Sequence, residues 1–251
     1  MINEMIYNFF AGYFQGLTEF LPISSSGQLL LLGIDLDTTI MLHFGTVFSI
    51  IIYYNKYIKK LINQFFKDDR KILYFIIVGC LPISIVGFLS KDIIESIFYN
   101  NTSLSQSILS YTFITTALFL FLTKDINDQK QLTLKIVFIV GVLQIFALLP
   151  GISRSGVTIC SLLILGTNHK DAIRFSFLMA IPIILGASFL SLLKGDFQYD
   201  SPSIAVGFFS SFFFGLLAIH LTNHLIKLKK YWLFSIYCFI IAIIIFIKGI
   251  I

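Results

Sequence analysis

Long apolar runs, separated by short polar stretches, make up almost the whole chain. A membrane-crossing helix needs about 20 mainly apolar residues. Six runs are about this long: 38–55, 71–90, 105–123, 172–193, 203–225 and 231–250. The linkers between the runs of the first half, 56–70, 91–104 and 124–132, are polar. The pattern predicts an all-α, polytopic membrane protein with six transmembrane helices.

Two further apolar stretches are interrupted in the middle. Residues 5–22 have a helical pattern that stops at Pro22, and the pattern resumes only after a serine-rich turn. Residues 133–166 are broken in the same way around Pro150. Broken backbone is tolerated at membrane depth only where protein or a water-filled cavity surrounds it. We therefore expect two re-entrant helix–loop–helix hairpins, each entering the membrane and returning.

The two interrupted stretches resemble each other. A shift of 129 positions superimposes identical residues without a gap, and these are Gly12 on Gly141, Gln15 on Gln144, Ser24 on Ser153, Ser26 on Ser155 and Gly27 on Gly156. Concentration on Gly, Gln and Ser within apolar surroundings indicates an internal repeat. The chain is expected to be a single membrane domain, with repeat one at 1–125 and repeat two at 130–251.

The order of the elements predicts that the two repeats are inverted. A hairpin that does not cross, followed by three spans, places the next hairpin on the opposite side of the membrane. Inverted repeats of this kind bring their broken segments together near the midplane. We expect Glu19 and the serine turn 24–26 to meet residues 153–158 there.

Composition agrees with a membrane protein. The chain is 57% hydrophobic and 12% charged, with a mean hydropathy of +0.91, which excludes a soluble globular domain. Residues 1–10 contain Glu4 and have no basic segment or small-residue cleavage site, so no removable signal peptide is expected. The net charge of +5 does not imply nucleic acid, because in a membrane protein the side on which the cations lie is the informative quantity.

The cations divide unevenly between the two sides of the predicted topology. Fourteen of the 18 Lys and Arg residues fall on the side that carries 56–71, three fall on the other, and Arg154 is the remaining one. The positive-inside rule makes the rich side cytoplasmic. We expect a multi-pass protein of the plasma membrane with both termini outside and the site opening to the outer face.

Arg154 lies between two apolar segments, where an arginine is costly and usually functional. It is surrounded by Ser153, Ser155, Gly156 and Thr158, where an apolar helix begins. Helix starts bind anions, and the guanidinium fork matches phosphate oxygens. With Glu19 as an acid, this set suits a phosphate ester or diphosphate. Alternatives are an arginine that snorkels to the surface and an ion pair with Glu19 that is purely structural.

These residues form two extended motifs, QGLTEFLPISSSG at 15–27 and PGISRSGVT at 150–158. Both resemble the signature motifs of the undecaprenyl-diphosphatase family of the bacitracin-resistance type, and the resemblance extends over nearly the whole chain. It implies an integral membrane hydrolase that removes the terminal phosphate of a polyprenyl diphosphate, giving the lipid monophosphate carrier. It also implies a divalent cation, Mg²⁺ or Ca²⁺.

The resemblance assigns roles to individual positions. Glu19 would be a catalytic acid and the metal ligand, Ser25 the catalytic serine, and Arg154 the phosphate-binding arginine. Six further motif residues would bind the substrate's phosphates, and these are Ser24, Ser26, Gly27, Ser153, Ser155 and Thr158. The nucleophile is either Ser25 or a metal-activated water.

Three positions are candidate accessory residues. Gln15 occupies the first place of the family's Glu/Gln-x-x-x-Glu motif. Gln28 stands where many members have a histidine with an acid/base role, which glutamine cannot fill. His43 in the first span could take over that role, or the reaction needs no side-chain base. Gln28 also argues against the histidine-nucleophile lipid phosphatases, whose motif has a histidine there.

The expected partners are the polyprenyl diphosphate lipid and the bilayer, without nucleic acid. The oligomeric state stays open, with a homodimer among the options. A flippase or transporter for a lipid-linked phosphate or other anion is the alternative function, because inverted repeats with broken helices are also a transporter plan.

Overall fold

The computed structural model describes residues 2–34, 36–67, 70–99, 102–124, 130–192 and 202–250, and the elements within these ranges are helices. They are α1 (Ile2–Phe20), α2 (Ser25–Leu31), α3 (Leu36–Tyr53), α4 (Asn55–Phe65), α5 (Lys71–Tyr99), α6 (Thr102–Phe121), α7 (Leu134–Leu143), η1 (Gln144–Leu148), α8 (Arg154–Ile164), α9 (His169–Leu192), α10 (Pro202–Lys227), η2 (Tyr231–Leu233) and α11 (Phe234–Ile250). The all-α prediction is therefore confirmed.

Four of the described segments are long and apolar enough to cross a membrane: Lys71–Phe98, His169–Leu190, Pro202–Lys227 and Tyr231–Lys248. Shorter apolar helices cover Thr38–Tyr53, Ser105–Phe121, Leu134–Leu148 and Arg154–Ile164. Large apolar side chains lie exposed on the outside, among them Leu89 at 73% and Phe88 at 65%. An apolar exterior of this kind is stable in lipid rather than in water. The chain is a multi-pass membrane protein.

Two of the predicted polar linkers contain helix. Residues 91–99 continue α5 as its last turns, and Lys91 forms an i,i+4 ion pair with Glu95 at 3.6 Å. Such pairs stabilise helices at polar positions, where hydrophobicity gives no signal. Within 56–70, α4 separates its lysines from an apolar side, of which Leu61 is buried. The description of 56–70 and 91–104 as linkers was therefore wrong for α4 and for the last turns of α5.

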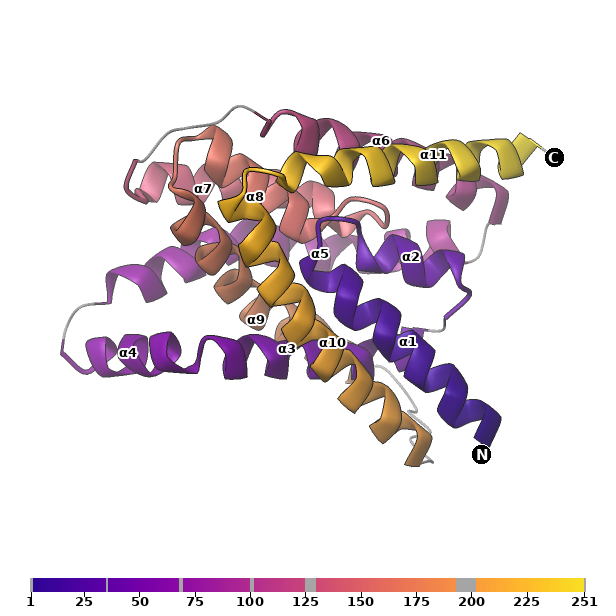
Figure 1. The fold of residues 1–251 in the computed structure, drawn as a ribbon, viewed down its shortest axis with the longest axis horizontal. Coiled ribbons are helices and arrows are strands. Elements are labelled where there is room, and N and C mark those ends of the chain that lie inside the picture. Colours follow the sequence, from indigo (N-terminus) through magenta and orange to yellow (C-terminus); the bar gives the residue numbers. More distant parts are fainter. Residues whose placement is uncertain are drawn as a thin grey trace.

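The helices are arranged as adjacent pairs (Figure 1). α6 and α11 run side by side along one edge, and α3 continues into α4 along the opposite edge. α1 packs along α10, and both cross the view obliquely and extend below α3. The start of α1 and the end of α11 lie at the same end of the molecule, whereas α4 lies at the other end.

Two close helix crossings depend on glycine. α1 meets α10 where a methyl group at Gly12 would overlap the carbonyl oxygen of Gly207. α7 meets α5 where a methyl group at Gly141 would lie 2.7 Å from the carbonyl oxygen of Gly79. Small residues let backbones of membrane helices approach this closely. Gly12 and Gly141 are also equivalent positions of the sequence repeat.

The buried core holds the two broken segments in place. Phe20, the last residue of α1, is fully buried and meets Phe177 of α9 edge to face at 5.2 Å. Phe113 of α6 is also fully buried, and its ring leaves no room for a side chain at Gly27 of α2. The core therefore places the α1–α2 turn at the centre of the helical assembly.

Candidate active site

The first broken segment turns at Ser24. After α1 ends at Phe20, the chain turns through Pro22 and begins α2 at Ser25. Ser24 has φ 61°, a left-handed conformation that is uncommon outside glycine, and its Oγ accepts the backbone N–H of Gly27 at 3.3 Å. A serine at this position caps the helix by satisfying a free backbone donor. After this turn Ser25 is half-buried and Ser26 is exposed.

The second broken segment has the same cap. η1 ends at Leu148, Gly151 adopts φ 94°, and α8 begins at Arg154. Oγ of Ser153 accepts the backbone N–H of Gly156 at 3.1 Å. Ser24 and Ser153, which the sequence repeat superimposes, therefore perform the same local function.

Helix α6 fastens this second loop. Oγ1 of Thr116 donates to the carbonyl oxygen of Gly151 at 2.9 Å and accepts the N–H of Ser153 at 3.1 Å. Oγ1 of Thr112 donates to the carbonyl oxygen of Pro150 at 2.7 Å. Buried loop backbone needs such partners, because water does not reach it. The start of α8 is thereby held in a defined position.

The two loops also bind each other directly. The backbone N–H of Gly151 donates to Oγ of Ser24 at 3.0 Å, and Oγ of Ser155 donates to the carbonyl oxygen of Leu21 at 3.3 Å. The expected meeting of the two motifs therefore occurs.

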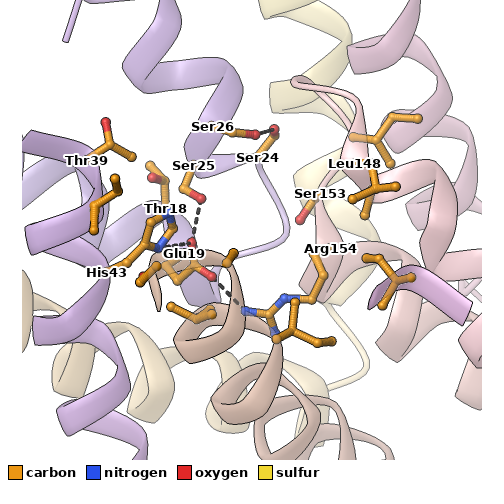
Figure 2. Close-up of a pocket in the computed structure, with 18 residues that line it drawn as sticks. Thr18, Glu19, Ser24, Ser25, Ser26, Thr39, His43, Leu148, Ser153 and Arg154 are labelled. Atoms are coloured by element: carbon orange, nitrogen blue, oxygen red, sulfur yellow. Dashed lines mark hydrogen bonds and ion pairs between the residues drawn. The ribbon is translucent and has the colours of Figure 1, made fainter. Parts of the chain in front are cut away.

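Glu19 lies at the centre of this meeting point (Figure 2). Its Oε1 accepts from Nη2 of Arg154 at 2.6 Å, and its Oε2 accepts from Oγ of Ser25 at 2.6 Å. The side chains of Glu19 and Arg154 are only 6% and 12% exposed, so little water weakens the pair. Acid, hydroxyl and guanidinium come from three helices, α1, α2 and α8.

Gln15 and His43 extend the cluster. Nε2 of Gln15 lies 3.1 Å from Oε2 of Glu19 and 2.8 Å from Nδ1 of His43, which is itself 3.8 Å from Oε2 of Glu19. His43 on α3 is therefore beside the carboxylate. The sequence left two possibilities: His43 takes over the acid/base role, or the reaction needs no side-chain base. The first requires His43 near Glu19, and the structure places it there.

A cavity of about 250 Å³ opens beside Glu19. Its walls carry seven of the predicted residues: Glu19, Ser24, Ser25, Ser26, His43, Ser153 and Arg154. A larger, mostly apolar hollow of about 330 Å³ lies against it between α5 and α9. The two share wall residues Ile83, Leu148, Ile183 and Ala187. The space therefore has a polar end and an apolar end.

Other predicted residues lie behind the cavity wall. Gly27 and Ser155 support the loops, and Oγ1 of Thr158 donates to the carbonyl oxygen of Arg154 at 2.8 Å and also contacts Oγ of Ser176. Nε2 of Gln28 donates to the carbonyl oxygen of Ile23 at 3.3 Å. These four residues therefore hold the loops in place and do not line the cavity.

Sequence reasoning missed several residues of the site. Thr18, Thr39 and Ser188 border the cavity, and Thr112 and Thr116 fasten the α8 loop. Thr39 lies one helical turn before His43, so the spacing on α3 was a usable signal. The hydroxyls of α6 and α9 belong to no motif, and only packing brings them here.

Among the described residues that line the cavity, Glu19 is the carboxylate that a metal ion would use. Among the described residues, no group of three or more His, Cys, Asp and Glu side chains is close enough to hold an ion. Mg²⁺ commonly uses one or two carboxylates together with phosphate oxygens of the substrate. Glu19 surrounded by hydroxyls fits that mode, in which substrate and ion bind together.

Comparison with known proteins identifies the family. The family profile described as Bacitracin resistance protein BacA matches residues 8–244. The protein named Undecaprenyl-diphosphatase of Thermotoga maritima is 36% identical over 248 residues, covering 95% of this chain and 98% of that protein. The one of Methanococcus vannielii is 34% identical over 250 residues, covering 94% and 97%. The one of Christiangramia forsetii is 36% identical over 253 residues, covering 92% and 93%. The chain belongs to the bacitracin-resistance protein BacA family.

Proposed function

We propose that this protein is an integral membrane phosphatase that hydrolyses undecaprenyl diphosphate to undecaprenyl phosphate and inorganic phosphate. The observation that carries the proposal is the junction of Glu19 with Ser25 and Arg154 at a cavity formed by both broken segments. Relatives of nearly the same length carry the name Undecaprenyl-diphosphatase. The activity follows from that similarity together with a site suited to phosphate.

Arg154 is suited to binding the terminal phosphate. Its Nη2 is occupied by Glu19, whereas its Nη1 is buried and has no hydrogen-bond partner among the described residues. An unpaired buried donor is costly, and a turn of the guanidinium toward the cavity would let an arriving phosphate oxygen relieve that cost. The N-terminal end of α8 adds a positive dipole at the same place.

Ser25 is proposed as the nucleophile and Glu19 as its base. Oγ of Ser25 already donates its hydrogen bond to Oε2 of Glu19. Oγ would attack the terminal phosphorus, the bond from phosphorus to the bridging oxygen would break, and the lipid monophosphate would leave. The proton of Ser25 would pass to Glu19, and water would then hydrolyse the phosphoserine. Arg154 would stabilise the charge on the transferred phosphoryl group.

A divalent cation, Mg²⁺ or Ca²⁺, is proposed to bind with the substrate. Glu19 would hold it, and hydroxyls of the 24–26 turn would lie next to it. Its chemistry would be to neutralise charge on the diphosphate.

The apolar hollow is suited to the first part of the polyprenyl chain. It is lined by side chains such as Phe88, Ile94 and Leu190, and it joins the polar cavity through the shared wall at Leu148. A substrate with a charged head and an apolar tail would place each part beside matching surfaces.

We propose the full topology of six spans and two re-entrant hairpins, in two inverted repeats of 1–125 and 130–251. The matched serine caps and the matched glycine crossings support the repeat. The start of α1 and the end of α11 lie at the end of the molecule opposite α4, which carries several lysines. This arrangement supports termini outside and α4 in the cytoplasm. The active site would then open to the outer face.

Phosphate release by the purified protein tests this function. Wild-type protein in detergent with Mg²⁺ or Ca²⁺ is expected to release phosphate from undecaprenyl diphosphate. Ser25→Ala should reduce the rate by at least about a thousandfold, because a nucleophile is lost. Ser96→Ala, which removes a local helix contact at a residue that lines neither the cavity nor the apolar hollow, is the matched control. Substrate binding without release would contradict the proposal and favour a carrier.

A further inference from the structure

His43 has its two ring nitrogens in different surroundings. Nδ1 contacts Gln15 inside the protein, at 2.8 Å. Nε2 makes no hydrogen bond to a residue in the described ranges, and it is not among the enclosed polar atoms that lack a partner. His43 borders the cavity and its side chain is 24% exposed. Because the two nitrogens point in different directions, Nε2 is the one open to the cavity.

Glu19 determines how the amide of Gln15 is oriented. An ionised carboxylate only accepts hydrogen bonds, so the Gln15 atom 3.1 Å from Oε2 of Glu19 has to be the NH₂ group. The opposite orientation would place two acceptor oxygens against each other. Oε1 of Gln15 is left buried and without a partner among the described residues. An orphaned acceptor is tolerated here because the carboxylate holds the amide in this orientation.

The orientation of Gln15 in turn determines the tautomer of His43. The NH₂ group has two hydrogens, of which one goes to Glu19 and the other to Nδ1 of His43. Nδ1 must therefore present its lone pair, and the single ring proton of the neutral imidazole lies on Nε2. A doubly protonated ring would place a donor against the donor of Gln15.

We propose that Gln15 is a positioning residue that holds His43 as a hydrogen-bond donor, with Nε2–H directed to a phosphate oxygen of the substrate. This proposal rests on the proposed function. Phosphate oxygens are acceptors, and the guanidinium of Arg154 is a second donor group on the wall of the same cavity. His43 then stabilises charge on the phosphate instead of removing a proton, which leaves the base role to Glu19.

Nitrogen-15 NMR of histidine-labelled protein in detergent, without substrate, tests the tautomer. The chain has four histidines, and His43→Gln identifies the signal of His43 by its loss. Wild-type protein is expected to show a protonated Nε2 and an unprotonated Nδ1. Gln15→Glu replaces the donor by an acceptor and should move the proton to Nδ1. A wild-type signal with a protonated Nδ1 overturns the positioning role of Gln15.

A matched pair of substitutions tests the donor. A glutamine at position 43 can place an N–H near the Nε2 position, whereas an asparagine places its N–H near Nδ1. Because loss of one preorganised donor costs about 10²–10³ in rate, His43→Asn should lower kcat by about a hundredfold. His43→Gln should lose less than about tenfold, because it restores the donor. Equal losses in the two variants would overturn the donor role.

His220→Gln is the control for both measurements, because His220 is exposed on α10 and does not border the cavity. It should retain full activity and leave the His43 signal in place. The NMR result does not depend on turnover. A wild-type protein that hydrolyses nothing would therefore refute the proposed function and the role of Nε2, whereas a wrong tautomer refutes the positioning by Gln15 alone.

Discussion

Arg154 and Glu19, 135 positions apart in the sequence, form an ion pair with 2.6 Å between Nη2 and Oε1. The pair joins the start of α8 to the last turn of α1. An ion pair between these two residues is also what a purely structural role of Arg154 requires. The phosphate-binding role depends on two further observations, the unpartnered Nη1 and the location of both residues at the cavity.

Arg154→Lys separates these two roles. Lysine retains the charge and can still pair with Glu19, but it loses the planar fork that can bind Glu19 and phosphate together. We expect a loss of at least about a hundredfold in kcat/KM, comparable to removal of a transition-state donor. A thermal melt should show a folded protein. Near-normal turnover in this variant would limit Arg154 to a structural ion pair.

Gln28→His tests whether the histidine that the family resemblance implies at this position can act here. The side chain of Gln28 donates to the carbonyl oxygen of Ile23 and does not border the cavity. A histidine in the same place would remain behind the turn, so we expect the rate to change by less than about tenfold, below the effect of a general base. A gain of a hundredfold would show that position 28 reaches the substrate.

Gly12→Ala tests the packing of α1 on α10. The added methyl group would overlap the carbonyl oxygen of Gly207, and overpacking of this kind costs about 1–3 kcal/mol. We expect a lower melting temperature in detergent. Gly186→Ala is the matched control, because nothing lies within 4 Å of the added methyl group. Its helix propensity should leave stability unchanged or improve it. Equal stability of the two variants would contradict the close crossing.

Cysteine labelling tests the topology. Asn3→Cys and Lys60→Cys place thiols at exposed positions of α1 and α4, while Cys80, Cys160 and Cys238 are buried. An impermeant thiol reagent applied to intact cells should modify position 3 and should reach position 60 only after permeabilisation. Labelling of position 60 in intact cells would reverse the proposed orientation.

The apolar periodicity, the breaks at Pro22 and Pro150 and the repeated glycines and serines were sufficient to predict the apolar helices and the two broken segments, but not α4 or the last turns of α5. These features act locally. A proline followed by a serine-rich turn ends a helix and a serine caps the next one, as at Pro22 and Pro150, whereas Pro82 and Pro182 lie inside α5 and α9. The meeting of the two motifs was also predicted, from the proposal that the two halves are inverted repeats, which would bring their broken segments together.

Side-chain directions and long-range partners were not predictable in this way. The motif treats Ser153 and Thr158 alike, but Ser153 borders the cavity and Thr158 contacts Ser176 behind it. Thr116 fastens the α8 loop from another helix, and Gln15 lies between Glu19 and His43. Each of these relations depends on how helices distant in sequence pack. The local pattern limits which residues can perform chemistry, whereas packing determines which of them reach the same cavity.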